Sequence, residues 1–321
     1  MDFAALSNRQ QIGLVRRALV KILPSHSSLS LATHSFNTTF RLQIGSDSFA
    51  IRVNINSQRT PSEVRGEVAL VEVLAESGEV HVPRPAPIFD GSPITFVSVP
   101  GFEVPRPVVA YEWLSGRHFA DSPRLWHRVG SSLRAIQRAT KDLELPDGCE
   151  RPVLKDVLDG LLWRLEGAEF SEALAIANAA LESLNHQPRQ LLHFDLHPGN
   201  LKVHEDQVSV FDFDDSVWSW TAADVAQSLF YARSARNSRE SESEFWRGFG
   251  LKPEDLGTSM SQIEALVAGR ALLLADDLAG TINAELREMI PRYLEVTRKR
   301  IRHFLSTGVF DPKVASMKDS S

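Results

Sequence analysis

The sequence predicts an α+β chain with two lobes: a small lobe with a five-stranded antiparallel sheet and one main helix, and a larger, mostly helical lobe. Two observations carry this prediction. Five short stretches of alternating, β-branched or aromatic residues lie before residue 114, and the pattern after Gly116 is mostly helical. Runs of strands followed by runs of helices are typical of α+β proteins. The length of 321 residues suits about two domains, which we expect at residues 1–113 and 114–321.

The first elements are a helix and three strands. Apolar residues recur at helical spacing over residues 3–22, and Pro24 ends the run. Short strands are expected at residues 29–32, 38–44 and 48–53, where side chains alternate and turn residues separate the runs. Their close spacing predicts antiparallel neighbours.

A helix over residues 61–77 comes next, because Thr60 suits the N-cap and Pro61 suits the first turn. Strands at 94–99 and 108–113 complete the sheet. The later helices are expected over 122–141, 152–184, 222–232, 241–248, 253–280 and 283–305. Residues 316–321 should form a frayed tail.

Composition narrows the setting of the protein. A net charge of −6 argues against general nucleic-acid binding, which needs concentrated Lys and Arg. The single cysteine, Cys149, fits a reducing compartment. No apolar run reaches the roughly 18 residues of a membrane span. We therefore expect a cytoplasmic protein with neither nucleic-acid nor membrane partners, and the sequence gives no indication of its oligomeric state.

Two acidic clusters beside short apolar runs dominate the middle of the chain: HFDLHPGN at residues 193–200 and FDFDD at residues 211–215. Phosphoryl transfer needs metal ions on the phosphates, a positioned hydroxyl and a carboxylate that accepts its proton. The spacing of His193, Asp195 and Asn200 matches a kinase catalytic loop. We expect Asp195 to be the base, with Asn200 and Asp212 as Mg²⁺ ligands brought together by a hairpin of residues 201–203 and 208–210.

Two other interpretations fit parts of these clusters. An apolar strand that ends in Asp-x-Asp at residues 212–214, with a later pair at Asp276 and Asp277, also looks like a haloacid dehalogenase-like phosphatase. That interpretation leaves the catalytic-loop spacing unexplained. A hydrolase metal site could instead use His193, Asp195 and His197, which alternate along the chain, but Pro198 and Gly199 indicate a loop.

The two motifs resemble the aminoglycoside phosphotransferase and choline kinase-like family, whose members share the protein-kinase fold. The usual family form is HGDLHPGN, so Phe194 departs from it, and residues 223–226 (ADVA) are similar to the family's Asp-Leu-Ala helix start. The resemblance covers about residues 28–235. It implies a bilobal protein-kinase-like fold, with ATP and Mg²⁺ as cofactors. It also implies that Asp224 bonds the catalytic-loop backbone and that His193 and His197 support the loop.

By the same resemblance, residues 1–113 form a nucleotide-binding lobe. Arg52 stands where kinases have a lysine on the third strand, with Glu67 as its expected partner and Glu63, one turn earlier, as the rival. Glycine is missing from the loop at residues 33–38, so Ser35 and backbone amides would meet phosphate there. The segment from Tyr111 to Trp113 should present backbone groups to adenine.

The sequence indicates an acceptor class for the reaction. Residues 114–321 would hold the catalytic and substrate-binding lobe, and transfer to a hydroxyl of a small molecule is expected. Asp214, Asp215, Asp276 and Asp277 would favour a cationic amino sugar or amino alcohol, unless the last two lie on a solvated helix face. Two tryptophans, Trp218 and Trp220, could line the pocket or pack in the core. A protein substrate, phosphorylated as by bacterial stress-response Ser/Thr kinases, and a non-catalytic kinase-fold binding module are the alternatives.

Overall fold

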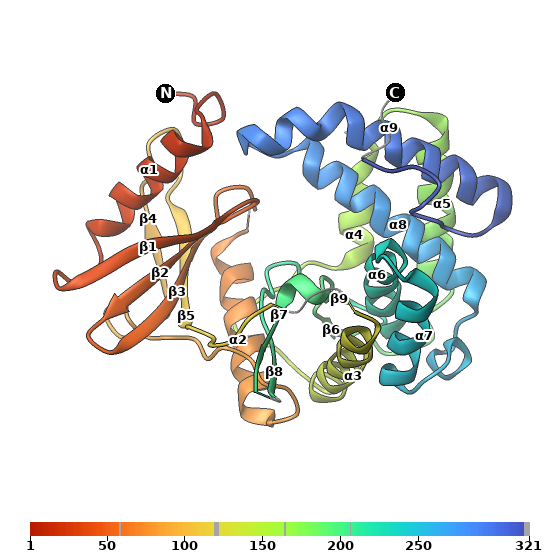
Figure 1. Cartoon of the computed structure of the whole chain (residues 1–321), viewed down its shortest axis with the longest axis horizontal. Coiled ribbons are helices and arrows are strands. Elements are labelled where there is room, and N and C mark those ends of the chain that lie inside the picture. Colours follow the sequence, from red (N-terminus) through yellow and green to blue (C-terminus); the bar gives the residue numbers. More distant parts are fainter. Residues whose placement is uncertain (58, 119–121, 164, 206, 318–321) are drawn as a thin grey trace.

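The computed structural model describes residues 1–57, 59–118, 122–163, 165–205 and 207–317. An antiparallel sheet with one helix on its outer side forms one lobe, and helices form most of the other (Figure 1). This arrangement confirms the predicted α+β, bilobal fold. Most of the expected tail, residues 318–321, lies outside the described residues.

The sheet contains the five predicted strands, which run in the order β1-β2-β3-β5-β4. Their bounds are β1 (Ser27–His34), β2 (Thr38–Ile44), β3 (Asp47–Val53), β4 (Ile94–Val97) and β5 (Arg106–Glu112). Side chains on β3 alternate between the two faces. Ile51 and Val53 pack in a cluster with α1 (Asn8–Val20), whereas Arg52 pairs with Glu67 on α2 (Pro61–Ser77). The sheet therefore presents a charged group on the face that α2 covers.

Two hydrophobic clusters lie on either side of the sheet. The smaller one fills the space between the sheet and α1, and includes Phe40, Val15 and Leu19. The larger one runs from α2 through the helical part of the chain. Helix α2 belongs to the first 113 residues, yet its apolar face is continuous with the core of the helical lobe.

Seven helices make up most of the described chain after residue 122, and two of them meet at unusually close range. They are α3 (Pro123–Ala139), α4 (Leu154–Asp159), α5 (Ala168–Glu182), α6 (Thr221–Ser234), α7 (Ser238–Phe249), α8 (Met260–Ala279) and α9 (Ala284–Thr307). In α3, a Cβ on Gly130 would overlap the carbonyl oxygen of Phe245. In α7, a Cβ on Gly248 would overlap that of His127. The two glycines thus allow backbone-to-backbone packing of these helices.

Short strands frame the central motifs. The predicted hairpin is present as β7 (Leu201–His204) and β8 (Gln207–Val210). A strand that the sequence did not predict, β9 (Val217–Ser219), pairs with β6 (Gln190–Leu192). All named strand pairs among the described residues are antiparallel. The phosphatase interpretation, which needs a parallel α/β core in the last third of the chain, is therefore wrong.

The structure corrects three helix predictions. The expected helix over residues 152–184 is broken into α4, a 3₁₀ turn and α5, and Gly167 between them adopts a φ of 140°, which only glycine tolerates readily. The expected helix over 253–280 begins late, because the Ser259 side chain caps α8 at Met260. The first helix starts at Asn8 instead of residue 3. No helix within the described ranges is both long and apolar enough to cross a membrane.

The loop between β1 and β2 and the turn between α8 and α9 are joined directly. Asn56 Oδ1 accepts the N–H of Ile282 at 2.7 Å, and its amide donates to the carbonyl oxygen of Phe36. Asn283 donates from the turn to the carbonyl oxygen of Ser35 at 3.0 Å. We call this set of contacts the α8–α9 latch. It connects the sheet to the late helices at a place far from the chain crossover after β5 (Figure 1).

Candidate active site

The predicted catalytic loop begins where β6 ends. Phe194 has a φ of 61°, in the left-handed region that a bulky residue rarely adopts. Its N–H donates to Asp224 Oδ1 at 2.9 Å, which is the backbone contact that the family resemblance implies. The left-handed backbone gives a physical reason for the glycine in the usual family form at this position.

The Asp195 carboxylate accepts hydrogen bonds from four side chains. Its Oδ1 accepts from Arg270 at 2.7 Å, Gln227 at 3.1 Å and the Tyr231 hydroxyl at 3.2 Å. Its Oδ2 accepts from the Asn200 amide at 3.0 Å. Burial opposes ionisation, but the nearby His197 imidazole and the Arg270 charge outweigh it and lower the pKa of Asp195 to about 2. The carboxylate is therefore ionised at neutral pH, as a proton acceptor must be.

His193 and His197 form hydrogen bonds with the backbone of the catalytic loop and its neighbouring segment. His193 is fully buried; its Nε2 donates to the Phe211 carbonyl oxygen and its Nδ1 accepts the N–H of Asp195. Burial lowers the pKa of His193 to about 4, so the ring is neutral. His197 Nδ1 accepts the N–H of Gly199, and its Nε2 lies 3.6 Å from Asp195 Oδ2. Both His193 nitrogens are already committed, so the hydrolase metal site is wrong.

The expected metal ligands meet beside the hairpin. Asn200 donates its amide to Asp195, which leaves its carbonyl oxygen without a hydrogen bond among the described residues. Desolvation by the pocket walls and the charges of Asp214 and Asp195 raise the pKa of Asp212 to about 7, against the opposing charge of Arg52. Crowded, weakly neutralised oxygens of this kind suit a hard cation.

The oxygen set is incomplete for a metal on its own. No group of three or more His, Cys, Asp or Glu side chains in the described part of the chain is arranged to hold a metal. One amide and one carboxylate would leave most of an octahedral Mg²⁺ shell to phosphate oxygens and water. The residues therefore fit a metal that arrives with a nucleotide.

Arg52 and Glu67 form the buried ion pair on the sheet side of the site. Arg52 Nη2 bonds Glu67 Oε2, while Nη1 lies 3.5 Å from Asp212 Oδ1. Glu67 also accepts the Tyr111 hydroxyl at 2.8 Å. The rival, Glu63, instead accepts the N–H of Thr60 and caps α2. The structure thus pairs Arg52 with Glu67, as family spacing favoured.

Asp214 forms hydrogen bonds and ion pairs with side chains from the sheet and its loops. It accepts from Asn37 at 2.9 Å and Asn54 at 3.2 Å, and lies within ion-pair distance of Arg52 and Arg59. Burial opposes ionisation, but these arginines outweigh it and hold the pKa of Asp214 below its usual range. This carboxylate is therefore neutralised by the protein.

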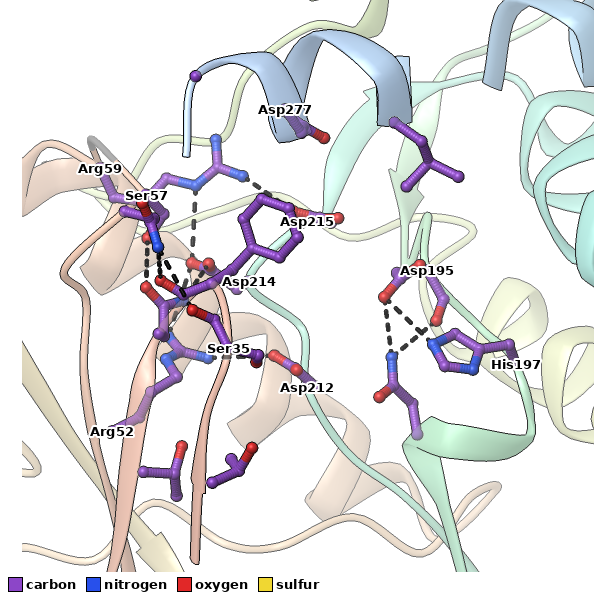
Figure 2. Close-up of a pocket in the computed structure, with 18 of the residues that line it drawn as sticks. Ser35, Arg52, Ser57, Arg59, Asp195, His197, Asp212, Asp214, Asp215 and Asp277 are labelled. Atoms are coloured by element: carbon purple, nitrogen blue, oxygen red, sulfur yellow. Dashed lines mark hydrogen bonds and ion pairs between the residues drawn. The ribbon is translucent and has the colours of Figure 1, made fainter. Parts of the chain in front are cut away.

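Two cavities meet at the expected metal ligands. The first, of about 690 Å³, includes Leu31, Val71, Trp113 and Phe213 among its apolar lining. The second, of about 550 Å³, is rich in carboxylates. Asn200, Asp212, Arg52 and Ser35 line both cavities. Figure 2 shows Asp195 and His197 on one side of the second cavity, Arg52 and Asp214 on the other, and Asp277 on the helix above.

The predicted adenine contacts need revision. The N–H groups of Glu112 and Trp113 donate to the carbonyl oxygens of Arg84 and Ser48, so these two amides are not available to adenine. The Tyr111 side chain is directed to Glu67. The carbonyl oxygens of this segment stay a prediction. The Trp113 side chain, which the prediction did not use, lines the apolar cavity, and the Lys202 ammonium nitrogen lies 4.6 Å from its ring centroid.

The predictions for the acceptor side have mixed outcomes. Asp276 is buried and lines neither of the two cavities, so it contradicts both the solvated face and the acceptor pocket. Asp277 is exposed, as on a solvated face, and it lines the carboxylate-rich cavity beside Asp215. Trp220 is buried and donates to the Gln187 carbonyl oxygen, and Trp218 packs against the larger core. Neither tryptophan lines either of the two cavities.

Sequence reasoning missed Arg270, Gln227, Tyr231 and Arg59. Gln227 and Tyr231 lie three and seven positions after Asp224, on one face of α6. Arg270 is a single charge within the apolar run from Ala265 to Ala275, and such a buried charge requires a partner. These two signals were present in the sequence. Arg59 carried none.

Fold and site together define a kinase-like phosphotransferase. The chain belongs to the phosphotransferase enzyme family, whose model matches residues 32–258. It is an ATP-dependent phosphotransferase that acts on an alcohol group.

Three known proteins are similar to this chain in sequence or in fold. An uncharacterized protein of Deinococcus radiodurans is 28% identical over 268 residues, covering 79% of this chain and 77% of its own. The microcompartment-associated aminopropanol kinase has a TM-score of 0.75 at 20% identity, covering 94% and 99% of the two chains. The Plasmodium vivax ethanolamine kinase has a TM-score of 0.61 at 13% identity, covering 92% and 91%. These structural similarities show the shared fold.

Proposed function

We propose that the chain transfers the γ-phosphate of ATP to a hydroxyl group of a small molecule that carries an amino group. The observation that carries this proposal is the meeting of two cavities at Asn200 and Asp212. The apolar cavity suits a planar base, and Asp195 lines the carboxylate-rich cavity, in which the acceptor would lie. In this proposal residues 1–113 bind nucleotide and residues 114–321 supply the base and the acceptor site.

We assign the residue roles on the support of the geometry. Asp195 accepts the proton of the acceptor hydroxyl, because its carboxylate is ionised and lines the acceptor cavity. Asn200 and Asp212 hold Mg²⁺, which would neutralise charge on the transferred phosphoryl group. Arg52, held by Glu67, contacts the nucleotide phosphates, and Ser35 faces them from the loop between β1 and β2.

Carboxylates of the second cavity that lack a full complement of positive partners support an amino group on the acceptor. Asp277 makes no ion pair among the described residues, and desolvation with the Asp215 charge raises its pKa to about 7. Asp215 shares Arg59 and Arg270 with other carboxylates. An ammonium group would supply the missing positive charge. Enzymes named for aminopropanol and ethanolamine share the fold, and a cavity of about 550 Å³ suits a small molecule better than a peptide segment.

The test uses purified protein with ATP and Mg²⁺, a panel of amino alcohols and aminoglycosides, and unphosphorylated proteins as competing acceptors. We expect phosphorylated product from an amino-bearing small molecule. Asp195→Asn should reduce turnover by at least about 1,000-fold, while calorimetry finds ATP–Mg²⁺ affinity nearly unchanged, because the base does not contact the nucleotide. Asp212→Ala should instead weaken that affinity. Full turnover in Asp195→Asn would refute the assignment of the base, and labelling of proteins alone would refute the acceptor class.

A further inference from the structure

Arg270 is buried at the boundary between α8 and the catalytic loop. Its side chain is 3% exposed, and its Nη2 lies 2.7 Å from Asp195 Oδ1 and 3.8 Å from Asp215 Oδ2. An arginine placed this deeply must be matched by carboxylates. It thus ties α8, which also carries Asp277, to the proposed base.

The Phe194 ring covers this guanidinium. Its centroid lies 5.4 Å from the guanidinium carbon of Arg270, within the range of a cation–π contact. Phe194 itself is 6% exposed. A phenylalanine with a φ of 61° carries a backbone cost that glycine would avoid. The contact with Arg270 is a gain that glycine cannot provide, and it is specific to the residue by which this loop departs from the family form.

The consequence is a difference between the two oxygens of Asp195. Oδ1 receives three donors, from Arg270, Gln227 and Tyr231, and so has no remaining capacity. Oδ2 receives the Asn200 amide, with His197 at 3.6 Å. Only Oδ2 retains a place for an incoming hydroxyl.

We propose that Arg270 and Phe194 form a positioning pair that holds Asp195 by Oδ1 and presents Oδ2 to the acceptor hydroxyl. This inference rests on the proposed function, in which Asp195 is the proton acceptor. Arg270 acts through Asp195 and is a positioning residue. Phe194 excludes water from the guanidinium and keeps its Nη2 directed at Oδ1.

The first experiment compares Arg270→Met and Arg270→Lys, with 2-aminoethanol, 1-amino-2-propanol and the acceptor found in the panel as probes. We expect kcat to fall about 100-fold for Met and about 10-fold for Lys, because small displacements of a base are costly. The ATP–Mg²⁺ affinity should stay within about twofold, which shows that the variants are folded. An unchanged or higher kcat in Arg270→Met would overturn the proposal.

The control is Arg233→Met. Arg233 is also a largely buried arginine, paired with Glu264 and Glu242, but it lies outside both cavities. It should lower the melting temperature while leaving kcat within about twofold. An equal loss of kcat in both arginine variants would reduce Arg270 to a merely structural role and overturn the proposal.

The second experiment tests the pairing. Phe194→Leu keeps an apolar side chain and the left-handed backbone but lacks a π face. We expect about a threefold loss of kcat in the wild-type background and no further loss in Arg270→Met. Equal losses in both backgrounds would contradict the pairing.

A crystal structure of Arg270→Met supplies a readout that does not depend on turnover. The Asp195 carboxylate should rotate away from its present position, and an unmoved carboxylate would overturn the inference. If Asp195→Asn is inactive while Arg270→Met is fully active, the proposed function stands and the positioning pair fails. If Asp195→Asn is active, the proposed function itself fails.

Discussion

The fold shifts the pKa values of Asp212 and Asp214, only two positions apart in the chain, in opposite directions. Asp214 is surrounded by Arg52, Arg59 and Arg151, and its pKa lies below the usual range. The pKa of Asp212 is raised to about 7 because desolvation and neighbouring carboxylates outweigh Arg52. The sequence FDFDD presents both as equivalent acidic residues. Asp214 therefore links the sheet to the segment after the hairpin through its ion pairs and hydrogen bonds. Asp212 remains available to bind a cation.

Glu67→Gln should weaken nucleotide binding. The change removes the charge that holds Arg52 and leaves the guanidinium to turn toward Asp212 and Asp214, at 3.5 and 3.7 Å. We expect about tenfold weaker ATP–Mg²⁺ binding by calorimetry, and a loss of about 3 kcal/mol in unfolding free energy. Glu63→Gln, one turn away in the α2 cap, should cost less than about 0.5 kcal/mol, because Gln can still accept the Thr60 N–H, and should leave ATP affinity unchanged. Equal affinities for the two variants would contradict the prediction.

His193 should make the fold sensitive to acid. Its pKa is lowered from 6.5 to about 4 by burial, so the folded state prefers the neutral ring. This contribution is fully present above pH 6.5 and is lost as pH falls through about 4. A shift of this size corresponds to about 3 kcal/mol at most.

Urea unfolding of wild type and His193→Gln between pH 7 and 4 measures this contribution. The stability difference between the two proteins should shrink as the pH falls. A difference that stays constant over this range would contradict the prediction.

The Asp195 environment shows how far residue-level prediction extends. Local spacing was enough to bring Asp195, Asn200 and Asp212 together at one site. Arg270 could not be found by spacing, because it lies 75 positions away and reaches Asp195 only through the packing of α8. Only its isolation in an apolar run hinted at a buried partner.

At the level of elements, the sequence predicted strands and helices correctly where apolar and polar residues alternate clearly or a helix cap is present. All five strands of the main sheet were found, and Thr60 caps α2 as expected. The failures have local causes. β9 has three residues, too few for a pattern, and forms because β6 pairs with it. Apolar periodicity continues across Gly167, so it could not reveal the backbone turn there.

The contact between α3 and α7 should tolerate no added methyl group. In Gly248→Ala the new Cβ would overlap the carbonyl oxygen of His127, so the helices must separate. We expect a loss of about 2–3 kcal/mol in unfolding free energy, measured by chemical denaturation. Gly160→Ala is the control, since nothing lies within 4 Å of a Cβ there. Its stability should change by less than about 0.5 kcal/mol, and equal losses would contradict the packing argument.

At the scale of the whole molecule, the α8–α9 latch joins the sheet side to the late helices at a place away from the chain crossover that leads from β5 to α3. The latch also involves α1, where Asn8 donates to Asn283 and Gln11 donates to the Ile282 carbonyl oxygen. Segments from the two ends of the chain therefore stabilise the same junction (Figure 1).

Asn56→Ala should open this junction. It removes the acceptor of the Ile282 N–H and the donor to Phe36, and an unpaired backbone group costs about 1–3 kcal/mol. We expect a lower melting temperature and faster hydrogen exchange at Ile282 by NMR. Asn185→Ala, at an exposed turn after α5, serves as the control and should change neither quantity. Unchanged exchange at Ile282 in Asn56→Ala would show that the latch opens independently of Asn56.

In the proposed function, we expect the α8–α9 latch to couple the binding of the nucleotide to the binding of the acceptor. It joins the loop that carries Ser35 to the end of the helix that carries Arg270 and Asp277. We expect a nucleotide that draws this loop inward to move α8 with it. Linkage requires the effect to be reciprocal: the factor by which ATP changes acceptor affinity must equal the factor by which acceptor changes ATP affinity. Loosening the latch should bring that factor toward one, even though none of its residues carries the chemistry.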